Sequence, residues 1–419
     1  MITIREYARP ATLEEAWQLN QKRPNRVLGG MLWLKMEKIS VGTAIDLSAL
    51  GLDTIEETDT EFAIGAMATL RSLETHAALN AATNGAMREA VRHIVGVQFR
   101  NCATVGGSVY GRFGFSDVLT LLLALDCDVE LYKAGRMPIA QFAALPYDRD
   151  ILTHVYIKKT PGLAVHYQSV RATQTDFPIL TCAAARTADG AYRFAIGARP
   201  MKAMLVCPTA APDELPAAVQ AAVPTGSRQD RQQPARQCRL PHPSGGGACQ
   251  ACRTGTGEPG GALMQIHFTL NHKKTAAEIA PDTLLIDLVR SLGCKSVKRG
   301  CETANCGLCT VFLDEKPVLS CSVLAARVDG RSVTTLEGLQ EEAAEFGAFI
   351  ADQGAEQCGF CNPGFIMNAL ALFREKTDPN EEEIKEYLAG NLCRCSGYEG
   401  QLRGIQNFLA WKKSKEAAQ

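Results

Sequence analysis

The sequence lacks the features that mark membrane, secreted and nucleic-acid-binding proteins. It has no run of about 18 apolar residues that could span a bilayer, and its start shows no basic stretch followed by an apolar segment and a small-residue cleavage site. Charge of one sign is not in excess either, because 44 Lys and Arg stand against 45 Asp and Glu, for a net charge of -1. These absences favour a cytoplasmic protein without a membrane or nucleic-acid partner.

Histidine is also scarce, and the 7 histidines form no group with metal-ligand spacing. Cysteine, in contrast, is abundant at 16 residues. Because a reducing cytosol disfavours disulfides, metal binding is the leading interpretation. Several cysteines stand apart from any cluster, and we expect each of them to be a small buried apolar residue. These are Cys102, Cys127, Cys182, Cys207 and Cys294.

Periodicity and composition predict an α+β multidomain protein. Strand and helix patterns alternate in a first, α/β unit, where Thr12 and Glu15 have capping-box spacing for a helix at 13–20. A small α+β unit follows. Beyond a polar stretch, strand patterns predict a small β-grasp domain, and recurring amphipathic segments then predict a helical bundle. In order, the expected boundaries are 1–160, 161–225, 226–263, 264–339 and 340–412.

Residues 226–263 contain no Lys, Ile, Val, Phe, Tyr, Trp or Met and are too poor in apolar residues to bury a core. One interpretation is a flexible linker. The other is translation of an out-of-frame segment, with Met264 as the former start of a separate small subunit. Two motifs in this stretch predict no site: Gly255-x-Gly257-x-x-Gly260 follows no strand and contains Pro259, and Cys249-x2-Cys252 has no partner pair.

Four cysteines predict a first iron-sulfur cluster. Cys301, Cys306 and Cys309 have the C-x4-C-x2-C spacing of plant-type ferredoxins, and Cys321 supplies a fourth thiolate after a short strand excursion. Gly307 and neighbouring small residues let backbone N–H groups turn toward the cluster sulfides. The spacing favours a 2Fe-2S cluster over a structural zinc ion.

Four further cysteines predict a second metal site. Cys358 and Cys361 form one pair, Cys393 and Cys395 form another, and each pair lies at the start or end of a predicted helix. Spacing alone leaves zinc open here, because paired cysteines are common in zinc sites. Together with the first set, the pattern favours a second 2Fe-2S cluster.

Two glycine turns in the first unit are candidates for phosphate binding. Val27-Leu28-Gly29-Gly30 follows a predicted strand, and Thr104-Val105-Gly106-Gly107-Ser108 forms a second turn. Missing side chains let backbone N–H groups approach a phosphate, although such turns also occur for purely structural reasons. Asp117 precedes the apolar run VLTLLLALD, where it is either a helix cap or a ligand.

These residues resemble the molybdenum hydroxylase family of xanthine dehydrogenases and aldehyde oxidases. Residues 264–412 resemble the iron-sulfur subunit through GCETANCGLCTVFLDEKPVLSC, QCGFCNPGF and GNLCRCSGY, with all eight ligand positions matched. Residues 1 to about 225 resemble the flavin-binding subunit through QFRNCATVGGSVYGRFGFSDVLTLLLALDCDVEL. The resemblance implies two 2Fe-2S clusters and FAD as cofactors.

The resemblance also implies which residues bind FAD. They are Val27, Leu28, Gly29, Gly30, Met31, Leu32, Ile94, Thr104, Val105, Gly106, Gly107, Ser108, Asp117, Leu152 and Gln168. The sequence departs from the family at three places. Gly29-Gly30-Met31-Leu32-Trp33 replaces Gly-Gly-Gly-Thr-Asp, Ser108 replaces a common Asn, and Gln168 replaces a Lys of some members. These departures bear on FAD affinity.

The resemblance implies an oxidoreductase subunit without a catalytic residue of its own. Electrons would come from a molybdopterin-binding large subunit, near the second cluster and Gln357, and would pass through both clusters to FAD and an acceptor such as NAD. Three alternatives stay open. They are a flavin-free iron-sulfur electron carrier, a frameshifted and partly functional fusion product, and a zinc-binding interaction module.

Overall fold

The computed structural model describes residues 2–187, 189–198, 202–209, 214–222 and 261–417. We call residues 2–222 the N-terminal half and residues 261–417 the C-terminal half. The two interpretations of the polar stretch at 226–263 stay predictions, because residues 226–260 lie outside the described residues.

The chain begins with a small parallel sheet in the order β1-β3-β2. Its elements are β1 (Thr3–Ala8), α1 (Leu13–Asn20), β2 (Arg26–Leu28) and β3 (Ser40–Asp46). Helix α1 confirms the helix expected at 13–20, and the Thr12 hydroxyl accepts a hydrogen bond from the Glu15 N–H at 3.2 Å. The Glu15 carboxylate accepts from the Ala11 N–H instead of the Thr12 N–H, so the capping box is one residue out of register.

A five-stranded antiparallel sheet in the order β4-β5-β8-β6-β7 follows. Its strands are β4 (Ile55–Glu57), β5 (Glu61–Gly65), β6 (Cys127–Leu131), β7 (Gly135–Pro138) and β8 (Leu152–Lys158). The helices between them are α2 (Leu70–Thr75), α3 (Ala77–Ala82), α4 (Ala86–Arg92), α5 (Val97–Arg100), α6 (Val105–Tyr110), α7 (Asp117–Ala124) and α8 (Ile139–Ala144). Every residue of α7 is buried, because the segment is apolar on all sides apart from Asp117 and Thr120, which have polar partners.

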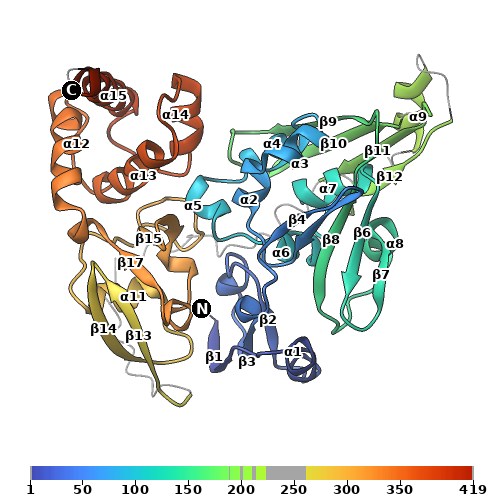
Figure 1. Cartoon of the computed structure of the whole chain (residues 1–419), viewed down its shortest axis with the longest axis horizontal. Coiled ribbons are helices and arrows are strands. Elements are labelled where there is room, and N and C mark those ends of the chain that lie inside the picture. Colours follow the sequence, from blue (N-terminus) through green and yellow to red (C-terminus); the bar gives the residue numbers. More distant parts are fainter. Residues whose placement is uncertain (1, 188, 199–201, 210–213, 223–260, 418–419) are drawn as a thin grey trace, which may run out of the picture.

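A four-stranded antiparallel sheet in the order β12-β11-β10-β9 completes the N-terminal half, with α9 (Leu215–Ala222) after it. The strands are β9 (Ala164–Arg171), β10 (Pro178–Arg186), β11 (Tyr192–Gly197) and β12 (Met204–Val206). Helices α4 and α7 pack against this sheet, as Figure 1 shows. The buried α7 therefore lies at the centre of the half.

The C-terminal half starts with a mixed five-stranded sheet in the order β14-β13-β17-β15-β16. Its elements are β13 (Met264–Leu270), β14 (Lys273–Ile279), α11 (Leu285–Ser291), β15 (Thr310–Leu313), β16 (Lys316–Leu319) and β17 (Ser332–Thr334). Ile266, Phe268 and Leu270 of β13 are buried at every second position, which confirms the expected strand. Strand β13 pairs with β17 in parallel and with β14 antiparallel.

Four helices follow: α12 (Gln340–Asp352), α13 (Asn362–Glu375), α14 (Glu381–Leu388) and α15 (Glu399–Ala417). An aromatic cluster holds them together, with the rings of Phe373 and Phe408 at a centroid distance of 4.8 Å and Phe346 beside both. Figure 1 shows these helices together at one end of the C-terminal half. They confirm the helical content expected there.

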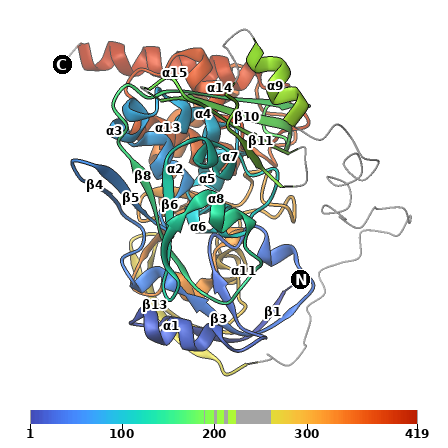
Figure 2. The same ribbon diagram turned by 90° about the vertical axis from the view of Figure 1, so that its right-hand side faces the viewer.

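The two halves contact each other along the short helix α5. This helix packs on β16, and the Asn101 side-chain amide just beyond it donates to the Pro317 carbonyl at 2.9 Å. In Figure 1, α5 projects toward the orange ribbon of the C-terminal half, and Figure 2 shows the N-terminal half from the side. The glycine turns and the first cysteine loop are both close to this contact, as described below.

Candidate functional site

The first cysteine set lies in a loop and a short helical turn of the C-terminal sheet. Cys301, Cys306 and Cys309 precede β15, and Cys321 lies in the turn η4 (Ser320–Ser322) that follows β16. Cys306, Cys309 and Cys321 are buried, and Cys301 is half-buried. Folding of the β15-β16 hairpin therefore brings the fourth thiol back to the loop that holds the other three.

The thiols of this set contact each other in two pairs. Contact with Cys306 lowers the pKa of Cys301 to about 4, and contact with Cys309 lowers the pKa of Cys321 to about 6. Cys321 also has a basic neighbour, since the Lys35 ammonium of the N-terminal half lowers the same pKa. Two close pairs of thiols are suited to two neighbouring metal ions.

Gly307 is needed where this loop meets the four helices. Its φ of 74° is in the left-handed region, and a Cβ there would lie 2.4 Å from the Gly390 carbonyl oxygen. The loop and the helices also share a hydrogen bond, because the Leu392 N–H donates to the Cys306 carbonyl at 2.9 Å. Leu392 directly precedes Cys393, so the two cysteine sets are joined through the backbone.

The second cysteine set lies between three of the helices. Cys358 and Cys361 precede α13, while Cys393 and Cys395 lie in the loop between α14 and α15. The sulfurs of Cys358 and Cys395 are 3.6 Å apart, and the Cys361 thiol contacts the Cys393 thiol. Each contact joins one cysteine from each segment, so this set also forms two close pairs. Cys358 and Cys395 are exposed.

The two glycine turns of the N-terminal half lie side by side. Gly29 follows β2 and Thr104 caps α6, and a Cβ on Gly29 would lie 2.9 Å from the Thr104 hydroxyl and 3.7 Å from the Gly107 Cα. A Cβ on Gly30 would lie 2.1 Å from the Cys102 carbonyl. The glycines thus allow a close approach between the turns, which a larger residue would prevent.

The N–H groups of the two turns are used differently. In the second turn, the Val105 and Gly106 N–H groups donate to the carbonyls of Ala68 and Ala66 at 2.9 and 2.7 Å. In the first turn, the described residues offer no acceptor for the N–H groups of Gly30, Met31 and Leu32. The first turn therefore retains donors for an anion, whereas Val105 and Gly106 have already paired theirs.

Met31 marks the departure from the family pattern in this turn. Its φ is 62°, a left-handed conformation in which glycine is free of strain and a longer side chain costs about 1–2 kcal/mol. The Met31 side chain is buried, which offsets part of that cost.

Asp117 is engaged in a buried ion pair. Its carboxylate accepts from the Tyr167 hydroxyl at 2.5 Å and from the Arg171 guanidinium, while Ser116 supplies the cap of α7. Burial raises the pKa of Asp117 and Arg171 opposes that rise. The carboxylate is therefore held by side chains of β9 within this half.

Gln168 is exposed at the edge of a cleft of about 510 Å³ that is also lined by His93, Arg171 and Cys182. Ile94 and Leu152 belong to the hydrophobic core and do not line this cleft. The expected FAD residues are thus divided among the glycine turns, the Asp117 ion pair, the cleft and the core.

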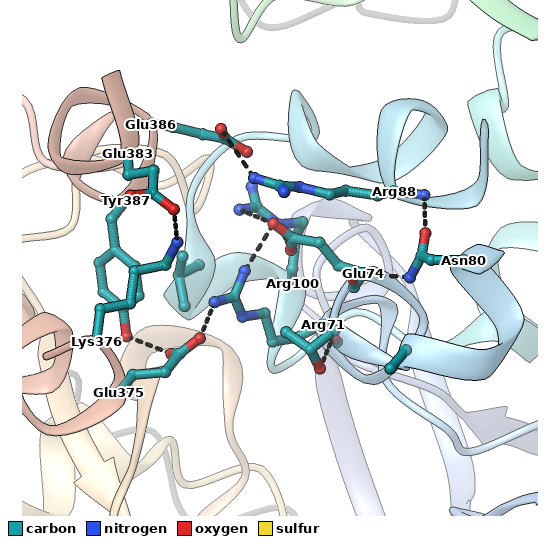
Figure 3. Close-up of a pocket in the computed structure, with 13 residues that line it drawn as sticks. Arg71, Glu74, Asn80, Arg88, Arg100, Glu375, Lys376, Glu383, Glu386 and Tyr387 are labelled. Carbon is teal, nitrogen blue, oxygen red and sulfur yellow. Dashed lines mark hydrogen bonds and ion pairs between the residues drawn. The ribbon is translucent and has the colours of Figure 1, made fainter. Parts of the chain in front are cut away.

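A second cavity of about 300 Å³ lies between the halves and is lined by charged residues (Figure 3). Arg100 at the end of α5 is fully buried and donates to both carboxylate oxygens of Glu74, at 2.6 and 3.2 Å. Arg71 joins this pair to Glu375 of α13 in the C-terminal half. Burial raises the pKa of Glu74, but Arg100 and Arg71 lower it below its usual value.

A further ion pair joins the first glycine turn to the C-terminal half. Arg327 donates to both carboxylate oxygens of Asp46 at 2.8 Å and to the Gly29 carbonyl at 2.7 Å. Tyr7 donates to the same carboxylate at 2.5 Å.

Sequence reasoning missed Arg327, Lys35 and Arg171, because their partners are distant in the chain. Only Lys35 carried a local signal, as a lone cation in the apolar run Met31-Leu32-Trp33-Leu34-Lys35-Met36.

Three family models match the chain. They are "FAD binding domain in molybdopterin dehydrogenase" over residues 3–159, "2Fe-2S iron-sulfur cluster binding domain" over residues 268–337 and "2Fe-2S binding domain" over residues 335–406. The chain is also 41% identical over 142 residues to a probable xanthine dehydrogenase subunit of Bacillus subtilis, a match that spans 33% of this chain and 82% of that protein. The chain belongs to the molybdenum hydroxylase family.

Molybdenum hydroxylases are oxidoreductases, and this member contains an FAD-binding domain and two 2Fe-2S binding domains. It is 40% identical over 143 residues to the xanthine dehydrogenase iron-sulfur-binding subunit of Escherichia coli O157:H7, covering 32% of this chain and 88% of that one. A carbon monoxide dehydrogenase structure from Hydrogenophaga pseudoflava is 21% identical with a TM-score of 0.49, covering 55% and 91%. None of the helices that the structure describes combines the length and apolar character needed to cross a membrane.

Proposed function

We propose that this molybdenum hydroxylase chain is an electron-transfer component that takes electrons from a molybdopterin-binding partner subunit and delivers them to FAD and then to an acceptor such as NAD. When bound, the clusters carry single electrons, and FAD can collect two of them before passing on a pair. The cysteines Cys301, Cys306, Cys309 and Cys321 would hold one cluster, and Cys358, Cys361, Cys393 and Cys395 the other. No residue of this chain is assigned to substrate hydroxylation.

The observation that carries this proposal is the pairwise approach of the thiols within each of two adjoining sets of four cysteines. In a 2Fe-2S cluster each iron takes two cysteine thiolates, so each set must supply two pairs. Cys358 approaches Cys395 within 3.6 Å, and Cys309 contacts Cys321. Among the described residues, no three His, Cys, Asp or Glu side chains converge on the position of one ion. Pairs, in contrast to a single convergent group, fit a two-iron cluster.

The exposure of the two sets supports the entry of electrons at the second set and their transfer to the first set. Three of the four cysteines in the first set are buried, and Cys321 among them contacts the N-terminal half, whereas Cys358 and Cys395 of the second set are exposed. Around them Phe360, Leu392 and Tyr398 are exposed by 46%, 48% and 46%. An exposed apolar rim of this kind suits contact with a protein partner. A molybdopterin-binding subunit would dock on this rim.

FAD binding would rest on the turn at 29–32. Three N–H groups of this turn, which no acceptor among the described residues pairs, and the absence of side chains at Gly29 and Gly30 suit a pyrophosphate. The resemblance extends this site to the Thr104–Ser108 turn and to Asp117 and Gln168, whose roles stay proposals. Arg171 would then neutralise Asp117.

The alternative is a flavin-free iron-sulfur electron carrier, and specific observations favour it. Val105 and Gly106 have committed their N–H groups to protein carbonyls, and Asp117 is paired with Arg171. A frameshifted fusion product would share these properties. A zinc-binding interaction module remains the third interpretation of the cysteines.

Cofactor counting on anaerobically purified full-length protein tests the proposal. We expect about four iron atoms and four acid-labile sulfides per chain, because each 2Fe-2S cluster contributes two of each, together with about one FAD. Iron and sulfide without flavin would favour the carrier. Zinc in place of iron would contradict the assignment of both cysteine sets.

As finer domain assignments, we propose a β-grasp domain at 264–339, a helical bundle at 340–412 and a truncated flavoprotein domain at 161–225 after the FAD-binding domain at 1–160.

A further inference from the structure

A lysine of the N-terminal half reaches a cysteine ligand proposed for the first cluster. Lys35 lies in the short helical turn η1 (Leu34–Met36), just after the glycine turn, and its side chain is 7% exposed. Its ammonium nitrogen is 3.2 Å from the Cys321 sulfur and 3.2 Å from the Cys321 carbonyl oxygen. Lys35 thus brings the N-terminal half into contact with a proposed ligand sulfur of the C-terminal half.

The environment of Lys35 requires an anionic partner. A buried ammonium group without one is strongly disfavoured, because it loses its hydration. Within the ranges that the structure describes, both hydrogen bonds of the Lys35 nitrogen go to Cys321, and Lys35 forms no ion pair with a carboxylate. A metal-bound cysteine is deprotonated, so the Cys321 thiolate would supply the missing charge once the cluster is in place. The lysine and the cluster ligand therefore complement each other.

We propose that Lys35 is a positioning residue that raises the reduction potential of the cluster held by Cys301, Cys306, Cys309 and Cys321. This inference rests on the proposed function. Reduction adds one electron, and hence one negative charge, to a cluster that already bears the charges of four thiolates. A cation that donates a hydrogen bond to a ligand sulfur stabilises the reduced form more than the oxidised form. Docking of the N-terminal half would thereby make this cluster a better electron acceptor.

The test is a redox titration of full-length protein, followed by EPR of each reduced cluster. In Lys35→Met we expect the midpoint potential of the first cluster to fall by about 59 mV, which corresponds to a tenfold smaller ratio of reduced to oxidised cluster at a fixed potential for one electron. The second cluster should keep its midpoint and so serves as an internal reference. Lys35→Arg keeps the charge, so its first cluster should have a midpoint potential close to that of the unmodified protein.

Lys38→Met is the matched control, because Lys38 is three residues further along the same segment and is exposed. It should leave both midpoints unchanged. An equal shift in Lys38→Met and Lys35→Met would show a general charge effect and would overturn the role of Lys35. Two cluster signals with an unchanged first midpoint in Lys35→Met would overturn this inference and leave the proposed function intact. Absence of two signals in the unmodified protein would contradict the proposed function itself.

A second measurement does not depend on the folding of any variant. In unmodified protein labelled with nitrogen-15 only at the lysine side-chain nitrogen, pulsed EPR of the reduced first cluster should detect a weak nitrogen coupling, because the Lys35 ammonium is hydrogen-bonded to a ligand sulfur. Nitrogen-15 coupling at the first cluster would support the contact; the second cluster is no blank for this measurement, because the Lys298 ammonium donates to the Phe360 carbonyl at 3.3 Å, next to Cys361. No lysine coupling at the first cluster would overturn it.

Discussion

The two halves of the molecule build their candidate cofactor sites from different parts of the chain. In the C-terminal half, the candidate ligands are side chains, and the eight cysteines form two sets that are joined by the Leu392–Cys306 hydrogen bond. In the N-terminal half, the site depends on backbone N–H groups, and neighbours such as Ala66 and Ala68 decide which of them are free. A thiol pattern therefore specifies its metal site locally, whereas a dinucleotide turn is completed only by tertiary packing.

Loss of one buried thiol should have the largest effect and would test how strictly the C-terminal site depends on side chains. Cys309→Ser should abolish the first cluster and retain the second, because a cluster iron loses one of its two thiolates. The reduced protein should then give about one spin per chain in EPR where the unmodified protein gives about two. Cys294→Ser is the control, since Cys294 is equally buried but contacts Asn271 and belongs to neither set. Retention of both signals in Cys309→Ser would contradict the ligand assignment.

Breaking the ion pair between the halves should have the next largest effect. Arg327→Met leaves Asp46 fully buried without its cation, at a cost of about 3–5 kcal/mol. We expect a lower midpoint of urea denaturation and easier proteolysis of the N-terminal half. Arg331→Met removes an exposed pair with Asp314 and should cost no more than about 1 kcal/mol. Equal effects of the two variants would mean that the Arg327 contact does not join the halves.

The buried carboxylate Glu74 should make the contact between the halves sensitive to acid. Its folded pKa lies below its usual value, so its contribution is present above the unfolded pKa of about 4.3 and is lost as pH falls below that value. Glu74→Gln should lower the free energy of unfolding by about 1.5–3 kcal/mol at pH 7, because Arg100 loses a charged acceptor.

Denaturation curves of Glu74→Gln and unmodified protein, measured from pH 7 to pH 3, check this prediction. The difference between the two proteins should shrink below about pH 4, where Glu74 becomes protonated in the unfolded state. Glu61→Gln is the control, because Glu61 pairs with Arg136 at a partly exposed site and its removal should cost at most about 1 kcal/mol. A difference that stays constant down to pH 3 would rule out the proposed ionisation.

The smallest effects are expected from the loss of one helix cap in each half, and they test whether caps contribute equally to stability in the two halves. Thr12→Ala in the N-terminal half and Asn380→Ala in the C-terminal half each remove a helix cap, at a cost of about 1 kcal/mol. Thermal denaturation followed by circular dichroism measures both. Markedly unequal losses would show that tertiary packing, and not the cap, determines the stability of these helices.

Local signals explain how much of the fold was predictable. The helix at 13–20, the alternating strand β13 and the four helices after residue 340 all follow from caps and periodicity, and the structure contains them. The same is true of the spacing that groups the cysteines. The pairing of thiols within each set required the fold, because Cys321 and the Cys393–Cys395 segment return to their partners only after a hairpin or two helices.

The contacts between the halves were not predictable from local patterns. Lys35 contacts Cys321 and Arg327 pairs with Asp46 across the two halves, and Arg100 pairs with Glu74 within the N-terminal half. In each case the two partners are far apart in the sequence. Asp117 illustrates the same limit in another way. Its position in the sequence allows either a helix cap or a ligand, but Ser116 caps the helix and Arg171 pairs with Asp117. Spacing cannot reveal such partners, because they come from segments that are distant in the sequence.

The central claim is that two different 2Fe-2S clusters lie in one chain, and EPR with spin counting tests it most directly. Full-length protein would be purified anaerobically and reduced with dithionite. We predict two distinguishable signals that together account for about two spins per chain, because each reduced 2Fe-2S cluster carries one unpaired electron. One signal would mean that only one cysteine set assembles a cluster. An EPR-silent protein containing zinc would contradict the account.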